Sequence, residues 1–131
     1  MKRKTQLALA HLVLAFLFLA AAAPGQSSGA SDVRPIRPVK GKKLILKGAV
    51  RDGDEVVYRF NARGGQSVEI KIKGRDADFS FYFVRGQDAQ TVASDTKSWN
   101  GRLPSGSRGV CEIAVHSTYK LAGYTLEVLV K

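Results

Sequence analysis

The sequence is poor in the residues that build covalent and metal sites: its 131 residues include one cysteine, one tryptophan and two histidines. A lone cysteine, Cys111, excludes an internal disulfide, so packing alone must stabilise the folded chain. His11 lies in an apolar N-terminal run, which leaves His116 as the only other imidazole. One cysteine and one histidine argue against a zinc site, because structural zinc takes four ligands, most of them of these two kinds.

The sequence also lacks a pattern that would supply an enzyme active site. His116 lies on the outward side of a predicted strand, and no neighbouring motif offers a nucleophile to pair with it. Cys111 lies on the inward side, where a thiol behaves as a small apolar group rather than a reactive one. We therefore expect a binding protein that is not an enzyme and that needs no cofactor.

The longest apolar run is too short to predict a membrane anchor. Residues 7–23 carry no formal charge and follow the basic residues Lys2, Arg3 and Lys4. A stable transmembrane helix needs about 20 apolar residues, whereas a basic head, a short apolar run and an alanine-rich exit are typical of a secretory signal peptide. We expect residues 1–23 to be removed, no stable membrane span to remain, and the protein to be periplasmic or secreted.

Acidic residues are scarce relative to basic ones: 21 lysines and arginines face 11 aspartates and glutamates, for a net charge of +10. Loss of the signal peptide removes three cations, so the mature charge is +7. The cations are spread along the chain, and export makes nucleic acid an improbable partner. The charge instead favours a weak, salt-sensitive attraction to an anionic envelope surface or glycan.

The stretch after the signal peptide has the composition of a linker. Residues 24–42 are dominated by Gly, Ser, Pro and basic residues, and their apolar positions follow no helical or strand period. Such a composition is typical of flexible chain. We expect a flexible tether over residues 24–42 and one folded domain over residues 43–131, large enough to bury a single core.

From residue 43 onward, apolar side chains alternate with the period of two that is typical of β-strands. Residues 55–62 place Tyr58 and Phe60 on one face, and residues 67–73 place Ile70 and Ile72 on one face. The Gly-Gly-Gln turn at residues 64–66 separates these two runs. Two alternating runs across a short glycine-rich turn predict a β-hairpin.

Six further stretches complete the predicted strands: 44–50, 79–84, 91–93, 99–103, 110–116 and 124–130. In the second of them Phe79, Phe81 and Phe83 share one face, and aromatic side chains of this size dominate a small core. Short strands at regular spacing predict an all-β, antiparallel β-sandwich of seven or eight strands. A closed barrel is the alternative.

Two turns bring carboxylates together, one with Asp52 and Asp54 and the other with Asp76 and Asp78. Calcium accepts six to eight oxygens, but neither turn has the spacing of an EF-hand loop, and aspartate is common in turns for backbone reasons alone. We predict no metal site, and a weak calcium site at either turn stays open.

Four stretches of the predicted domain resemble a known family. They are residues 58–68 (YRFNARGGQSV), 99–104 (WNGRLP), 109–115 (GVCEIAV) and 124–128 (YTLEV). Together they resemble the bacterial pre-peptidase C-terminal-like β-sandwiches and, among exported single-domain members, the periplasmic inhibitors of g-type lysozyme. The resemblance covers about residues 44–130, and its residues are core and turn positions, which specify a fold more than a function.

This resemblance implies a protein inhibitor whose loops, at one end of the sandwich, enter the substrate cleft of a lysozyme. Where family members carry Ser-Gly-x-Tyr, this chain has Arg108, Gly109, Val110 and Cys111. The implied partner-binding residues come from two loops, 105–109 and 117–123, and their neighbours: Arg102, Ser105, Gly106, Arg108, Tyr119 and Lys120. The alternative is an envelope glycan- or surface-binding module without inhibitory activity.

Overall fold

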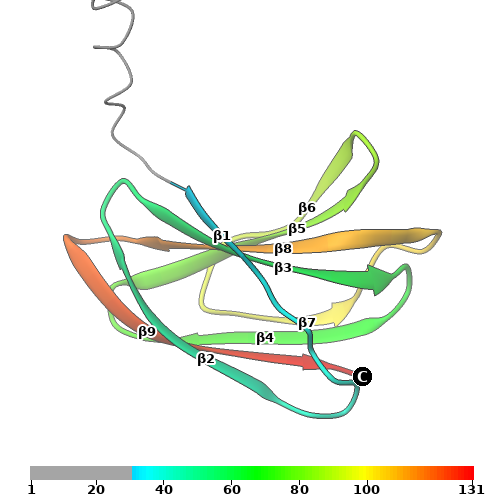
Figure 1. The fold of residues 1–131 in the computed structure, drawn as a ribbon, viewed down its shortest axis with the longest axis horizontal. Coiled ribbons are helices and arrows are strands. Elements are labelled where there is room, and N and C mark those ends of the chain that lie inside the picture. Colours follow the sequence, from blue (N-terminus) through cyan, green and yellow to red (C-terminus); the bar gives the residue numbers. More distant parts are fainter. Residues whose placement is uncertain (1–30) are drawn as a thin grey trace, which may run out of the picture.

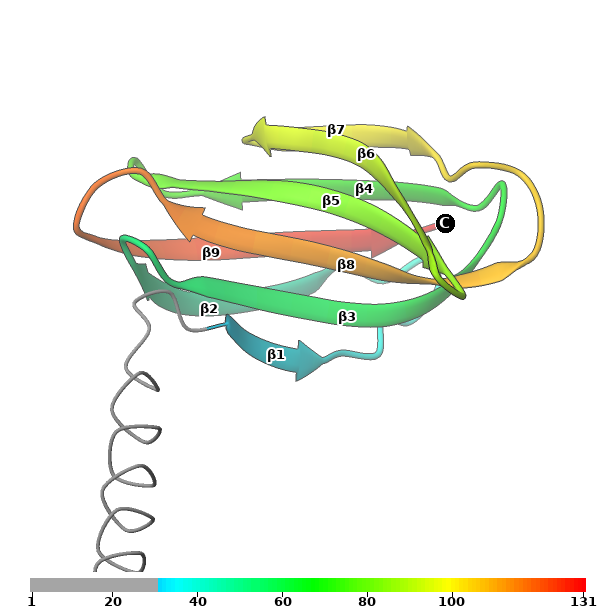
Figure 2. The same ribbon diagram turned by 90° about the horizontal axis from the view of Figure 1, so that it is seen from above.

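The computed structural model describes residues 31–131, so the predicted signal peptide lies outside the described residues. The described chain forms nine strands in two facing sheets and contains no helix (Figures 1 and 2). No helix that could cross a membrane is therefore found in this part. The strands are β1 (Ser31–Pro35), β2 (Leu44–Arg51), β3 (Glu55–Arg63), β4 (Ser67–Lys73), β5 (Ala77–Arg85), β6 (Asp88–Thr96), β7 (Ser98–Arg102), β8 (Arg108–Ser117) and β9 (Leu121–Val130).

One sheet has five strands in the order β1-β3-β8-β5-β6, and the other has four in the order β2-β9-β4-β7. All pairs are antiparallel except β1 with β3, which is parallel. Two separate sheets confirm the predicted all-β sandwich and exclude the closed barrel among the described strands. All eight predicted strands are present, and β1 is the ninth.

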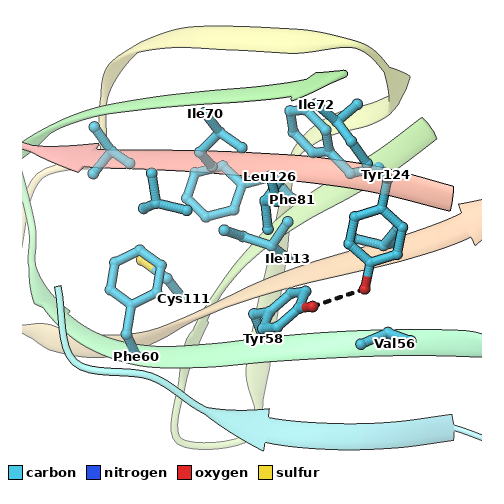
Figure 3. Packing of buried hydrophobic residues seen from close by; sticks show 14 of the residues in the cluster. Val56, Tyr58, Phe60, Ile70, Ile72, Phe81, Cys111, Ile113, Tyr124 and Leu126 are labelled. Carbon is cyan, nitrogen blue, oxygen red and sulfur yellow. Dashed lines mark hydrogen bonds between the residues drawn. The ribbon is translucent and has the colours of Figure 1, made fainter. Parts of the chain in front are cut away.

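The core lies between the sheets and is filled by the inward side chains that the alternating pattern predicted. Phe79, Phe81 and Phe83 of β5 are almost completely buried, and Cys111 of β8 is fully buried as expected from its inward position. Ile70 of β4 meets this layer from the other sheet (Figure 3). These side chains form one continuous apolar cluster, which holds the two sheets together.

One polar contact crosses the core. The phenol oxygens of Tyr58 on β3 and Tyr124 on β9 lie 2.7 Å apart and form a buried hydrogen bond between the sheets (Figure 3). Gly48 lies opposite Tyr124 in the β2–β9 register, and a Cβ at this position would lie 2.6 Å from the Tyr124 hydroxyl oxygen. A glycine is therefore needed here to leave room for the tyrosine ring rather than to permit an unusual backbone angle.

The predicted hairpin of residues 55–62 and 67–73 is wrong. Strand β3 belongs to the five-stranded sheet and pairs with β1 and β8, whereas β4 belongs to the four-stranded sheet and pairs with β9 and β7. The turn at 64–66 is thus a corner that carries the chain from one sheet to the other. The error has a physical reason: both strands have one apolar face, and a short glycine turn fits a hairpin and a corner equally well.

The corner is closed by the loop before β8. The N–H of Gly65, which has a φ of 78°, donates to the carbonyl of Leu103, and the N–H of Leu103 donates to the carbonyl of Gln66. A Cβ at Gly64 would lie 2.5 Å from the carbonyl oxygen and 2.6 Å from the nitrogen of Gly106. The two glycines thus serve different purposes, one for a positive φ and one for close packing of backbone.

Strand β1 lies inside the stretch 24–42, where we expected only flexible tether. It pairs in parallel with the first half of β3, and the N–H of Ile36 continues the contact by donating to the carbonyl of Arg59 at 2.8 Å. The chain then crosses to the other sheet, where the N–H of Gly41 donates to the carbonyl of Val130. All five residues of β1 are exposed. Because this strand has no buried face, its sequence lacks the alternation of apolar and polar residues that predicted the other strands.

Candidate binding site

The six residues predicted to bind a partner do not form one surface. Strand β8 is ten residues long, which corresponds to about 30 Å. The loop 103–107 precedes it and the turn 118–120 follows it, so the two lie at opposite ends of the sandwich (Figure 1). The structure brings four of the six residues together at one end and separates the remaining two from them; the four are Arg102, Ser105, Gly106 and Arg108, and the two are Tyr119 and Lys120.

A groove of about 810 Å³ lies at the end that contains the loop 103–107, and we call it the basic groove. It runs between the corner 64–66, the start of β8 and Lys131, the residue directly after β9. No acidic side chain is among the described residues that line it, whereas five lining side chains are cationic: Lys40, Arg63, Arg102, Arg108 and Lys131.

Arg63 and Arg108 are direct cross-strand partners in the β3–β8 register, and both are exposed. Like charges placed opposite each other destabilise a sheet. Four residues earlier on β3, Arg59 faces Glu112 and forms an ion pair of 2.8 Å with it. The same ladder therefore neutralises one arginine and leaves two others facing each other, without an ion pair for either in the described part of the chain.

The loop 103–107 projects from this end but is held at its base. Leu103 is buried in the core, and the guanidinium of Arg85 donates to the carbonyl of Ser105 at 2.9 Å. Arg85 itself packs over the ring of Phe83, 5.1 Å from the ring centroid. Residues 105–108 beyond these anchors are exposed. The loop thus offers a preorganised tip, which lowers the entropy lost on binding.

The tight turn 118–120 lies at the opposite end of the sandwich. Tyr119 is 59% exposed, and the ammonium of Lys120 lies 5.3 Å from the centroid of its ring. Ser117 closes the turn, because its hydroxyl oxygen accepts the N–H of Tyr119. His116, predicted to be an isolated surface histidine, forms a contact of 2.9 Å with Asp95. Hydrogen bonds from the Ser117 hydroxyl to the carbonyls of Tyr119 and Lys120 keep this turn compact.

Lys97 occupies the position where a cation would sit beside Asp78. Its ammonium donates to the carbonyls of Gly74, Arg75 and Ala77 and forms an ion pair of 3.0 Å with the Asp78 carboxylate. This set of oxygens resembles a cation site, but a tethered ammonium fills it. The described residues contain no group of three or more His, Cys, Asp or Glu side chains arranged to hold a metal ion, including at Asp52 and Asp54.

The cysteine has no access to solvent. Cys111 is fully buried, and desolvation raises the pKa of its thiol to about 12. A thiolate is therefore scarce at neutral pH, and the buried thiol is not exposed to reagents in solution. The inward position predicted for this residue is confirmed.

No protein-family model matches the chain, and no curated protein matches it in sequence. Its structure, however, is similar to those of periplasmic inhibitors of g-type lysozyme called PliG. The protein from Aeromonas hydrophila has 24% sequence identity and a TM-score of 0.66, and the match covers 79% of this chain and 99% of that one. The protein from Salmonella Typhimurium has 24% identity, a TM-score of 0.57, and coverage of 76% and 98%.

A mutant PliG from Escherichia coli gives a similar result, with 22% identity, a TM-score of 0.57, and coverage of 78% of this chain and 99% of that one. The resemblance predicted from the sequence motifs is thus confirmed as a likeness of fold. These neighbours are inhibitor proteins rather than enzymes. At such identities the likeness extends to the arrangement of the strands and leaves the binding residues to be argued from this chain.

Three cations of the basic groove were absent from the predicted site: Lys40, Arg63 and Lys131. Arg63 follows an alternating run that we predicted to form a hairpin with residues 67–73. With β3 paired to β8 instead, Arg63 falls opposite Arg108. The sequence feature that could have revealed this groove is the excess of cations near residues 63, 102 and 108. Only the correct pairing of the strands brings these residues together.

Proposed function

We propose that this protein inhibits a g-type lysozyme by inserting the loop 103–107 into the substrate cleft. The observation that carries the proposal is the anchored, exposed loop flanked by Arg102 and Arg108, on a fold shared with inhibitors of that enzyme class. The loop fits the requirement for a blocking element, because it projects beyond the sheets and is held at its base by Leu103 and Arg85.

The chemistry of the flanking residues supports this assignment. Glycoside hydrolases work through carboxyl groups that flank the scissile bond. A guanidinium placed in such a cleft forms charge-assisted, bidentate hydrogen bonds with a carboxylate. Arg108 and Arg102 have no ion-pair partner in the described part of this chain, so neither must break a contact in order to bind.

The proposal assigns the contact to one end of the sandwich only. Tyr119 and Lys120 are separated from Arg108 by the length of β8, about 30 Å, and cannot enter the same cleft. A role for them would require a second contact elsewhere on the lysozyme. The compartment belongs to the same proposal: the N-terminal pattern predicts export, and the similar structures are periplasmic proteins.

The test is a lysis assay with the mature protein and purified g-type and c-type lysozymes. We expect inhibition of the g-type enzyme, and we expect Arg108→Ala to raise the half-inhibitory concentration by about 10-fold to 100-fold, the range for losing a charge-assisted hydrogen bond. Lys120→Ala is the matched control, because it removes one exposed cation at the other end. Unchanged lysis at micromolar protein would refute the proposal.

A further inference from the structure

We propose that the basic groove is a binding site for a linear polymer that carries phosphate groups. This inference goes beyond lysozyme inhibition, because it assigns the groove a ligand of its own and requires no lysozyme. It stands on the charge of the groove, on the facing pair of arginines, and on the shape of the surface, three observations that are independent of the comparison with inhibitor structures.

The charge of the groove has one sign. Five cationic side chains line it, and one of them, Lys131, forms an ion pair of 3.6 Å with Glu69, which does not line the groove. At physiological ionic strength charges interact over about 8 Å, so cations that share one groove act together on a ligand. A groove of this kind concentrates anions and raises their association rate.

The facing pair, Arg63 and Arg108, specifies the kind of anion. The two guanidinium groups start from directly opposite positions of neighbouring strands, and each carries five N–H donors. One guanidinium already satisfies both oxygens of a carboxylate, whereas a phosphate has enough oxygens to be shared between two. An anion bound between the two side chains would relieve the repulsion between them, so the arrangement favours the bound state.

A further donor lies beside this pair. The side-chain oxygen of Gln66 accepts the backbone N–H of Arg63 at 3.2 Å, which leaves the NH₂ group of Gln66 available to a ligand. Gln66 lines the groove together with both arginines. A charged ligand would thus meet a neutral donor next to two cations, as in other phosphate sites that combine arginine with amide groups.

The shape indicates a chain rather than a single ion. A second hollow of about 400 Å³ adjoins the basic groove and shares Asn61 and Arg108 with it. It is lined by Arg85 as well, so the positive surface continues past the facing pair. A free phosphate would fill a small part of this surface, whereas a polymer would place successive phosphates along it.

The experiment measures direct binding to fluorescently labelled long-chain polyphosphate, without lysozyme, at several salt concentrations. We expect binding that weakens linearly on a plot of log affinity against log salt, as for other polyanions. Arg63→Gln/Arg108→Gln should lose at least about tenfold in affinity. The matched control is Arg51→Gln/Arg75→Gln, which removes the same charge from exposed positions at the opposite end and should lose less than about threefold.

Two competing polymers define the ligand class. Polyglutamate and single-stranded oligothymidylate, each matched to the polyphosphate in charge number, are titrated under the same conditions. Polyglutamate that binds as tightly would overturn the assignment to phosphate. Oligothymidylate that binds more than about tenfold tighter than polyphosphate would support the assignment to phosphate and identify nucleic acid as the preferred polymer. Equal losses in both double variants, or no binding by the wild type, would refute the site.

A second variant separates binding from folding. Arg63→Glu places a carboxylate opposite Arg108, as Glu112 is placed opposite Arg59 in the same ladder. We expect this variant to unfold at a higher temperature than the wild type and to lose polyphosphate binding. If Arg63 had a purely structural role, this variant would instead show both a lower unfolding temperature and weaker polyphosphate binding. Because no lysozyme is present, these results stand whether or not the protein inhibits that enzyme.

Discussion

Tyr58 and Tyr124 join the two sheets through a hydrogen bond of 2.7 Å between their phenol oxygens, and both side chains are buried. Tyr58→Phe removes one hydroxyl and leaves the Tyr124 hydroxyl without a partner in the core. We expect the free energy of unfolding to fall by about 1–3 kcal/mol. Tyr58→Phe/Tyr124→Phe should be less destabilised than the sum of the two single variants, because it leaves neither hydroxyl unsatisfied. Urea denaturation of the four proteins measures this coupling, and additive losses would contradict it.

Alkaline pH should destabilise the protein in two steps. Burial raises the pKa of Cys111 from 9.0 to about 12, and burial together with the hydrogen bond shared with Tyr58 raises the pKa of Tyr124 above its ordinary value of 10.0. Both groups ionise more readily when unfolded, so the stability they contribute is complete below pH 9 and decreases as the pH rises beyond it.

The slope of the unfolding free energy against pH identifies the ionising groups. Each contributes a loss of about 1.4 kcal/mol per pH unit between its unfolded and folded pKa values. Urea unfolding between pH 8 and pH 11 should therefore show a shallower decline in Cys111→Ala than in the wild type from pH 9 upward. Equal slopes in the two proteins would show that the thiol is not desolvated.

Lys97→Ala should lower the free energy of unfolding by about 2–3 kcal/mol, because it removes an ammonium that binds three carbonyls and a carboxylate. The empty set of oxygens should then accept a small cation. We expect methylammonium or potassium to raise the melting temperature of this variant more than that of the wild type. Lys71→Ala, an exposed lysine without an ion pair in the described chain, serves as the control and should show neither effect.

Gly64→Ala should disturb the loop that we assign to lysozyme binding. The added Cβ meets the backbone of Gly106 and Pro104 within 2.8 Å, and backbone cannot move aside as a flexible side chain can. We expect a loss of about 1–3 kcal/mol in stability together with weaker inhibition. Gly65→Ala is a suitable comparison, since no atom lies within 4 Å of its Cβ position and only the φ of 78° is unfavourable. Equal inhibition by both variants would contradict the role of the loop.

The alternating pattern was sufficient to predict which side chains enter the core. It placed Tyr58, Phe81 and Cys111 inward, and all three are buried. The pattern describes one strand at a time, however, and does not say to which sheet a strand belongs. The run ending at Arg63 was therefore paired with its neighbour in sequence instead of with β8, and the exposed strand β1, which buries no side chain, produced no pattern at all.

The site was predicted in part for a related reason. The prediction named Arg102 and Arg108, which line the basic groove, but it grouped Tyr119 and Lys120 with them although a strand of ten residues intervenes. Since the two loops that flank one strand must lie at its two ends, the sequence alone could have separated them. The pairing of Arg63 with Arg108 needed the structure, because the two residues are far apart in the chain and meet only through the β3–β8 register.

The position of Lys131 affects how the protein can be handled. This residue lines the basic groove, whereas Ser31, at the start of β1, pairs with Glu55 at the far end of the sandwich. An acidic affinity tag fused after Lys131 would start at the basic groove and would compete with an anionic ligand for its cations. Immobilisation through the segment before Ser31 leaves the groove facing away from the support, so surface-based measurements should be made in that orientation.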